Sequence, residues 1–270
     1  MNIIVINLHN RPNRFLNTLN ELRKQNLHDY IIRKEACSIE RAKKEYFKFI
    51  SIKAIENINN LKSTIILPTW GAVACAISHK ECWKYIIDNN LPYAIIIEDD
   101  LEIIDKYKFN INLNRSLDVV KQYLTDNLFI TFNSKIRNSN SLNNVEKINN
   151  AFTNCQFYII NNNMATNLYS NCINITYQID IQIGLTIKKF NNNYTDKCLN
   201  FNDSGICHSK KFKSDIQYYF LKYEDLQCLN LDDDIIHHIL TFLPNKKNII
   251  NYEFYDDNFN EILYNNYITL

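Results

Sequence analysis

The sequence predicts an α/β fold in which a mostly parallel central sheet is flanked by helices. Its first residues follow the order strand, helix, strand, which is typical of a parallel sheet. A long helical pattern later leads into the apolar run 93–97, which is rich in isoleucine and suits a strand buried on both faces. The chain has 270 residues, of which 46% are hydrophobic, so it can build one large domain with an appendage.

The first strand–helix–strand unit spans about the first thirty residues. Isoleucine and valine dominate residues 2–8 and predict the first strand. Pro12 lies in the first turn of the following helix, a position that proline favours, and apolar residues then recur at helical spacing to about Gln25. Tyr30-Ile31-Ile32 predicts the second strand, which we expect to lie parallel to the first.

The middle of the chain continues the alternation of helices and strands. Residues 42–58 have a helical pattern with dense charges, and we interpret the surrounding region 39–66 as a variable insertion. A clearer helix begins at Trp70-Gly71 and ends at Asn89-Asn90, which can cap it. The remaining predicted elements are strands at 126–132 and 157–160, a polar loop at 133–150, and a short helix at 163–172.

The predicted strand at 93–97 ends in three consecutive acids, Glu98, Asp99 and Asp100. In open α/β sheets, ligands bind at the carboxyl ends of the strands. Adjacent carboxylates repel one another unless a cation or several hydrogen-bond donors offset the repulsion. Because side chains alternate along a strand, Glu98 and Asp100 should share one side and suit a single divalent metal ion. A solvated acidic turn is the alternative interpretation.

The composition argues against several classes of protein. The formal net charge is +1, which gives no general attraction to nucleic acids or to membranes. No run of 18 apolar residues predicts a transmembrane helix, and the N-terminus has the pattern of a strand rather than a signal peptide. We therefore expect a cytoplasmic location. The eight cysteines include no C-x-x-C pair and are expected to be reduced, with Cys75 and Cys82 packed in a core.

Several short blocks follow one another in a characteristic order over residues 2–217. They are Val5-Ile6-Asn7-Leu8 with Arg11 and Arg14, the segment from Gly71 to Cys75 and Ser78-His79, the strand end Ile96-Ile97-Glu98-Asp99-Asp100, Tyr158-Ile159-Ile160, Asp180, and Ser214-Asp215-Ile216. This series resembles glycosyltransferase family 25, which includes bacterial lipooligosaccharide galactosyltransferases and animal collagen galactosyltransferases. The sequence departs from the family pattern at Ala74, at Cys37-Ser38 and in residues 151–155.

The resemblance implies a GT-A-type fold over residues 1–217 and the activity of an inverting, metal-dependent hexosyltransferase. The donor would be a UDP-sugar, with galactose as the implied hexose. The acceptor would be a hydroxyl group of a glycan, a lipid-linked sugar or hydroxylysine. A non-catalytic relative that serves as a binding or scaffold module is the alternative, because the departures at Cys37 and residues 151–155 affect regions expected to bind donor or acceptor.

Specific residues are expected to perform the parts of this reaction. Glu98 and Asp100, with His208 as a possible third ligand, would hold Mn²⁺ or Mg²⁺. The residues expected to bind the donor are Asn7, Leu8, Arg11, Arg14, Ser78, His79 and Asp99, with the arginines directed at phosphate or uridine and Asp99 at a ribose hydroxyl.

Four of these residues also have purely structural interpretations. A serine and a histidine within a helix are often structural, and Cys207-His208 can equally be a surface pair. Asp180 is the predicted general base, since its apolar neighbours would raise its pKa, although it also suits a helix cap.

The last part of the chain, residues 218–270, differs in character and is predicted to be a helical extension. A capped amphipathic helix begins after Leu231-Asp232-Asp233-Asp234 and stops at Pro244. Residues 229–244 resemble the start of an F-box, which would bind an adaptor protein, but a helix packed on the catalytic domain explains them as well. We expect donor binding not to require this extension.

Overall fold

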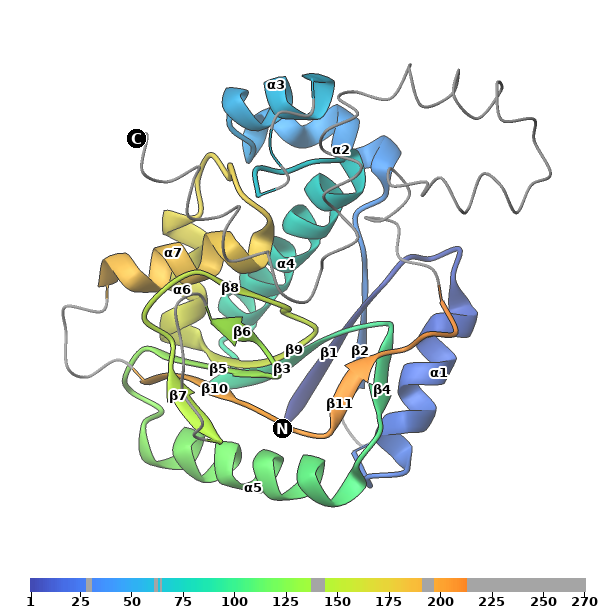
Figure 1. Cartoon of the computed structure of the whole chain (residues 1–270), viewed down its shortest axis with the longest axis vertical. Helices are drawn as coiled ribbons and strands as arrows, with labels where there is room; N and C mark the ends of the chain where they lie inside the picture. Colours follow the sequence, from blue (N-terminus) through green and yellow to red (C-terminus); the bar gives the residue numbers. More distant parts are fainter. Residues whose placement is uncertain (28–30, 61–62, 64, 137–143, 191–196, 213–270) are drawn as a thin grey trace, which may run out of the picture.

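The computed structural model describes residues 1–27, 31–60, 63, 65–136, 144–190 and 197–212. Within them, a seven-stranded sheet forms the centre of the molecule (Figure 1). Its spatial order is β2 (Ile31–Glu35), β1 (Asn2–Asn7), β3 (Tyr93–Glu98), β9 (Phe157–Asn161), β5 (Leu128–Phe132), β10 (Lys197–Phe201) and β7 (Val145–Lys147). The predicted α/β class is therefore confirmed.

The sheet is mixed, with five of its seven strands running in one direction. β1 lies parallel to both β2 and β3, and β5 lies parallel to β10. β9 runs antiparallel between β3 and β5, and β7 is antiparallel to β10. The carboxyl ends of β1, β3 and β5 consequently meet at the same edge of the sheet, and this edge carries the three acids.

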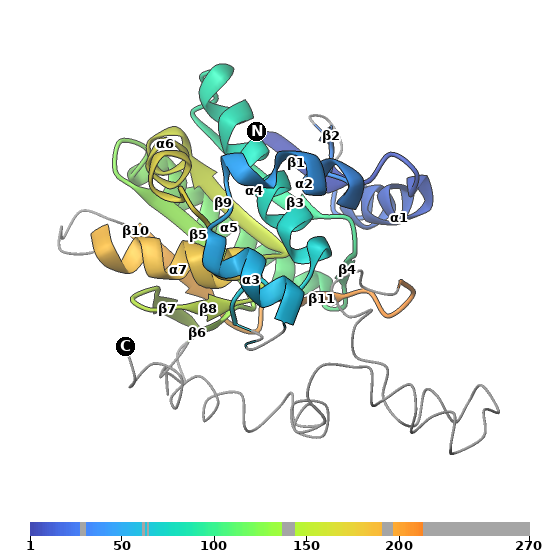
Figure 2. The ribbon, with the colours of Figure 1, turned by 90° about the horizontal axis from the view of Figure 1, so that it is seen from above.

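Helices cover both faces of the sheet, which explains the continuous apolar runs in its central strands. On one face, Ile4 and Ile96 pack in a core that includes side chains of α4 (Trp70–Asp88), α6 (Asn162–Asn171) and α7 (Ile179–Phe190). On the other face, Ile3 and Ile95 pack with α1 (Pro12–Arg23) and α5 (Lys106–Gln122). Figures 1 and 2 show the resulting three layers.

The region expected to be a helical insertion contains two helices rather than one. α2 (Ile39–Glu45) continues into a short 3₁₀ turn, Tyr46–Lys48, and α3 (Ile52–Asn60) follows. The helical path is interrupted at Ile50, which forms a bridge with Ile175. The backbone N–H of Ile175 donates to the Phe49 carbonyl at 2.7 Å, so pairing with a distant segment replaces the helical hydrogen bonds here.

Two short ribbons lie outside the central sheet. β4 (Leu101–Ile103) pairs with β11 (Ile206–His208) in antiparallel fashion, directly after the three acids. β6 (Lys135–Ile136) pairs with β8 (Phe152–Thr153), so the region 133–150, expected to be a polar loop, contains β6 and β7 among its described residues. These additions change the surroundings of the acids and leave the predicted layer arrangement intact.

The other predicted elements agree with the structure to within a few residues. α4 begins after Thr69, whose hydroxyl accepts the Ala72 N–H, and ends at Asn89, with Asn90 in the left-handed conformation. No helix in the described part of the chain is long and apolar enough to cross a membrane. The predicted Ser214-Asp215-Ile216 block and the helical extension at 218–270 lie outside the described residues.

Candidate functional site

The three acids at the end of β3 face different elements, although Arg14 contacts both Asp99, at 2.7 Å, and Asp100, at 3.5 Å. Glu98 faces α4, where the His79 Nε2 atom lies 3.1 Å from its Oε1 atom. Asp99 faces the loop after β1, and Asp100 faces the β4–β11 ribbon. The ligand atoms of Glu98, Asp100 and His208 nevertheless lie within 4.8 Å of one another. The structure thus brings together the three side chains that the sequence suggested as metal ligands.

Asp99 is held by the first block of the sequence. Its two carboxylate oxygens contact the Asn7 Nδ2 atom at 2.6 Å and the Arg14 Nη2 atom at 2.7 Å. Burial raises the pKa of Asp99 to about 6, although the charge of Arg14 and the hydrogen bond from Asn7 act in the opposite direction. Asn7, Arg14 and Asp99 therefore form one polar unit, and a role in donor binding remains a prediction for all three.

The loop after β1 is fixed mainly by its backbone and by Arg33 at the neighbouring strand. The Asn7 Oδ1 atom accepts hydrogen bonds from Arg33, at 2.9 Å from Nε and 2.6 Å from Nη2. The Arg11 N–H donates to the Leu8 carbonyl at 3.0 Å, and the Arg11 carbonyl accepts from the Asn7 amide. Leu8 and Arg11 thus shape the turn that presents Asn7 to Asp99, and Arg33 is a supporting residue that the sequence did not reveal.

Asp100 and His208 meet because the β4–β11 ribbon folds back over the end of β3. The Nδ1 atom of His208 lies 3.1 Å from the Asp100 Oδ2 atom, and Gln156 donates to Oδ1 at 3.1 Å. Burial by itself raises the pKa of Asp100, but the hydrogen bond and charge of His208 outweigh it and leave the pKa below its usual value. The Asp100 carboxylate therefore stays ionised, which suits a ligand for a cation.

Ser78 and His79 lie inside the protein, behind the acids. The Ser78 hydroxyl donates to the Ala74 carbonyl at 2.7 Å and accepts the Cys37 N–H at 2.8 Å. Those bonds connect α4 to the segment after β2. They also satisfy the hydrogen-bonding groups of the Ser78 hydroxyl, so its position is explained without a bound ligand. His79 is fully buried and contacts Glu98. Both residues support the site from within, and their contact with the donor stays a prediction.

A chain of buried hydrogen bonds fixes the orientation of Glu98. The Trp83 indole N–H donates to the Tyr158 hydroxyl at 3.0 Å, and this hydroxyl lies 3.0 Å from His79 Nδ1. Because a carboxylate only accepts, the hydrogen of a neutral His79 ring belongs on Nε2, facing Glu98, and Nδ1 accepts from Tyr158. Trp83, Tyr158 and His79 are all fully buried, so the chain is shielded from water.

We predict that Tyr158→Phe lowers the free energy of unfolding by about 1–3 kcal/mol, because Trp83 and His79 each lose a buried hydrogen-bond partner. Urea denaturation followed by tryptophan fluorescence measures this loss. Tyr107→Phe is a suitable control, since Tyr107 is 75% exposed. Equal stability of the Tyr158→Phe protein and the wild type would show that the hydroxyl does not hold this chain together.

Asp180 lies in the first turn of α7, close to the acids. Its carboxylate accepts the backbone N–H groups of Asn154 at 2.9 Å and Ile181 at 2.8 Å. Burial raises its pKa to about 6 against these hydrogen bonds, and the charge of Glu98 raises it further. Both predicted features are therefore present, the raised pKa that suits a base and the contacts that suit a helix start.

The position of α7 depends on a close approach to the segment before Asn154. A Cβ atom on Gly184 would lie 2.7 Å from the Asn150 carbonyl oxygen and 2.8 Å from the Ala151 Cα atom. Only glycine allows this packing without a backbone shift. This close packing holds Asp180 against segment 150–156. In the same segment, Asn154 contacts His208 and Gln156 donates a hydrogen bond to Asp100.

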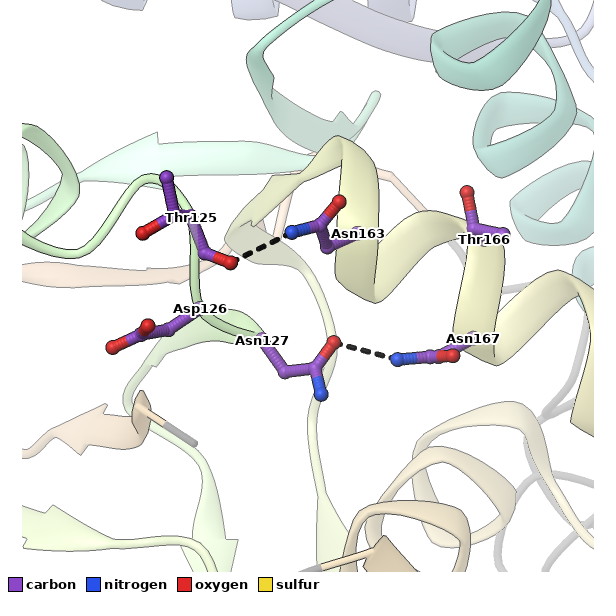
Figure 3. A pocket seen from close by; sticks show the side chains of 6 residues that line it. All are labelled: Thr125, Asp126, Asn127, Asn163, Thr166 and Asn167. Atoms are coloured by element: carbon purple, nitrogen blue, oxygen red, sulfur yellow. Dashed lines mark hydrogen bonds between the residues drawn. The ribbon is translucent and has the colours of Figure 1, made fainter. Parts of the chain in front are cut away.

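A second feature lies at the opposite edge of the sheet. Figure 3 shows a polar pocket lined by Thr125, Asp126, Asn127, Asn163, Thr166 and Asn167. These residues precede β5 or follow β9, and β9 is antiparallel to both β3 and β5, so the pocket and the acids are at different edges. Its only carboxylate is Asp126, and its amides bond to one another and to the backbone. The acid-bearing edge is therefore the stronger candidate for chemistry.

Comparison with known proteins agrees with the sequence blocks. Residues 1–183 match the sequence model of a family described as glycosyltransferase family 25 (LPS biosynthesis protein). The chain belongs to glycosyltransferase family 25. The family predicted from the sequence is thus confirmed, and the matched region includes the three acids and Asp180 but ends before His208.

One relative of this family 25 chain is procollagen galactosyltransferase 2 of Homo sapiens. The two sequences are 28% identical over 124 residues, which is 46% of this chain and 19% of the human protein. The alignment therefore spans about a fifth of the length of that relative.

Two further residues of the candidate site, Gln156 and Asn154, were not predicted from the sequence. Gln156 bridges the Asp100 side chain and the Cys207 carbonyl, and Asn154 contacts His208. They lie in a segment without a periodic pattern, and their partners are distant in the sequence. The only available signal was their position immediately before the predicted strand at 157–160.

Proposed function

We propose that this chain is a metal-dependent, inverting hexosyltransferase that transfers a sugar, with galactose as the first candidate, from a UDP-sugar to a hydroxyl group. The observation that carries the proposal is the convergence of Glu98, Asp100 and His208 at the carboxyl end of β3. Membership of a glycosyltransferase family and the human galactosyltransferase relative support the reaction class. The mixed sheet with its acid-bearing central strand supports the GT-A type of fold.

The residues present fit a divalent cation. Two carboxylates and one imidazole provide oxygen and nitrogen ligands, a set that suits Mn²⁺ and also admits Mg²⁺. The pKa of Asp100 lies below its usual value because of its contacts with His208, Arg14 and Gln156, which favours the charged form, and Gln156 donates to its Oδ1 atom. A bound cation would stabilise the negative charge that develops on the diphosphate as the glycosidic bond breaks.

The remaining residues of the site have separate tasks in this proposal. Asp99 accepts a hydrogen bond from a ribose hydroxyl, while Asn7 and Arg14 keep its carboxylate in place. Asp180 accepts the proton of the acceptor hydroxyl as its oxygen attacks the anomeric carbon. This attack from the side opposite the leaving group inverts the configuration. The acceptor itself is a glycan, a lipid-linked sugar or a hydroxylysine side chain.

A screen of nucleotide sugars tests the proposal directly. We expect the protein to hydrolyse or transfer from UDP-galactose in the presence of Mn²⁺, and to lose this activity in excess chelator. Readdition of Mn²⁺ should restore it, since the cation supplies several kcal/mol of charge stabilisation. A protein that processes no UDP-sugar with Mn²⁺ or Mg²⁺ would instead behave as a binding module of the same fold.

A further inference from the structure

Two side chains of α4, Cys75 and His79, lie beside Glu98 and form with it a second group that could hold a metal ion. Cys75 and His79 are one helical turn apart and point to the same carboxylate. The Cys75 Sγ atom lies 3.9 Å from Glu98 Oε1, and the His79 Nε2 atom lies 3.1 Å from it. The ligand atoms of all three residues are within 4.8 Å of one another. This group shares Glu98 with the Glu98–Asp100–His208 group but has different chemistry.

The spacing of these atoms suits a tetrahedral zinc ion. Zinc bonds of about 2.0–2.3 Å place neighbouring ligand atoms of a tetrahedron roughly 3.3–3.8 Å apart. The two separations from Glu98, 3.1 and 3.9 Å, differ from these values by a few tenths of an ångström, and the Cys75 Sγ and His79 Nε2 atoms lie within 4.8 Å of each other. A thiolate, an imidazole and a carboxylate form a common zinc ligand set, whereas Mn²⁺ and Mg²⁺ prefer oxygen ligands.

The surroundings prepare His79 for such a role. Its Nδ1 atom lies 3.0 Å from the Tyr158 hydroxyl, so the ring is oriented by a partner on its far side. A cation at Nε2 moves the ring hydrogen to Nδ1, where the Tyr158 oxygen can accept it. Cys75 is half-buried, and burial followed by the charge of Glu98 raises the pKa of its thiol, so an incoming metal ion has to displace the thiol proton.

We propose that Cys75, His79 and Glu98 bind one Zn²⁺ ion, or another thiophilic divalent cation, and that this binding inhibits sugar transfer. The Cys75 thiol releases its proton to solvent when the metal–sulfur bond forms. Inhibition follows because the Glu98 carboxylate is drawn towards α4 and away from Asp100 and His208. The inhibitory effect rests on the proposed function, whereas the binding site itself does not.

Co²⁺ is the probe for binding, because a thiolate ligand gives Co²⁺ a charge-transfer absorption in the near ultraviolet. Titration of the 270-residue protein should produce this band, and Zn²⁺ should remove it by displacement. Cys75→Ala should abolish the band. Cys82→Ala is the matched control, since Cys82 lies two turns further along α4 and outside the cluster. Absence of the band in the wild type, or its persistence in Cys75→Ala, would overturn the site.

Alkylation gives a second measure of binding that does not depend on spectra. Zn²⁺ should protect Cys75 from iodoacetamide in the folded protein, as mapped by mass spectrometry of its peptides. Glu98→Gln should weaken this protection, because the amide is a poorer ligand than the carboxylate. If Cys75 is alkylated in the absence of Zn²⁺ and reacts at the same rate in its presence, the proposal is contradicted.

The inhibitory effect is measured with Mn²⁺ present and Zn²⁺ added. In Cys75→Ala, the Zn²⁺ concentration for half-inhibition, relative to the variant's own uninhibited rate, should rise at least about tenfold. Cys82→Ala should retain the wild-type value. Equal sensitivity of wild type and Cys75→Ala would overturn the inhibition while leaving the Co²⁺ result in place. Absence of any Mn²⁺-dependent transfer would overturn the proposed function and leave the zinc site to the binding experiments.

Discussion

Asp100→Ala should reduce the rate of sugar transfer at least about a hundredfold, because loss of a metal ligand removes charge stabilisation worth several kcal/mol. A carboxylate oxygen of Asp100 lies within 4.8 Å of the ligand atoms of Glu98 and His208, and its side chain is held by Gln156 and His208. Calorimetric titration with Mn²⁺ should show weaker binding in the same variant. Higher Mn²⁺ concentrations should therefore recover part of the activity.

The control for this prediction is Asp88→Ala. Asp88 is also an aspartate near a strand of the central sheet, but its side chain is 52% exposed and pairs with Lys84 on the surface of α4. Its removal should leave both the rate and Mn²⁺ binding unchanged. Full transfer by the wild type in saturating chelator would refute the metal site, whatever the effect of Asp100→Ala.

The layers and the acid-bearing strand were predictable because their signals are local. The apolar run 93–97, with three consecutive isoleucines, predicts a strand buried on both faces, and the helical pattern of 70–88 predicts one long helix. Glu98, Asp99 and Asp100 adjoin that strand, so the edge where they lie follows from the strand direction alone. The hydrogen-bond partners of the three acids could not be predicted in this way, because these partners come from distant parts of the chain.

The β4–β11 ribbon shows why contacts between distant segments were missed. Each of its strands has three residues, too few for a periodic pattern, and Asp100 and His208 are 108 positions apart. His208 was suggested only on the general ground that metal sites often include a histidine. His208 comes close to Asp100 because the strand register pairs His208 with Leu101. This register cannot be predicted from the sequence.

Ser78 and His79 show a different limit of sequence analysis. A serine within a helix can bind a ligand or its own backbone, and the sequence does not distinguish between these. In the structure Ser78 bonds to Ala74 and Cys37, and His79 is enclosed by Tyr158 and Glu98. Whether Ser78 and His79 face a ligand or the protein interior depends on which face of α4 meets the sheet. Because α4 is apolar on most sides, the periodicity of the sequence does not identify that face.

Asp180→Asn should lower transfer by roughly two to four orders of magnitude, because the amide cannot take the proton of the acceptor hydroxyl. The amide oxygen can still accept one of the two N–H groups, from Asn154 or Ile181, so the stability loss should be about 1 kcal/mol. Affinity for Mn²⁺ and UDP should be nearly unchanged, since the hydrogen bonds of Asp180 go to the backbone of Asn154 and Ile181 and not to the three side chains proposed to bind the metal.

The pH dependence of the wild type provides an independent sign of the same role. A base must be unprotonated, and burial raises the pKa of Asp180 to about 6. The rate should therefore be constant above this pH and fall about tenfold per pH unit below it. The decline should be less steep for the residual activity of Asp180→Asn, where only the protonation of Asp99, whose pKa is also about 6, contributes. Asp118→Asn, a surface change on α5 at a side chain that is 72% exposed, should keep the wild-type profile.

Three outcomes for Asp180→Asn separate its possible roles. A large loss of rate with normal metal and UDP binding identifies it as the base. A normal rate per folded molecule together with lower stability would show that its carboxylate serves only to anchor α7 to Asn154. Loss of Mn²⁺ binding would make it a ligand instead, because its charge already interacts with Glu98, and the separation of roles between these two acids would then be wrong.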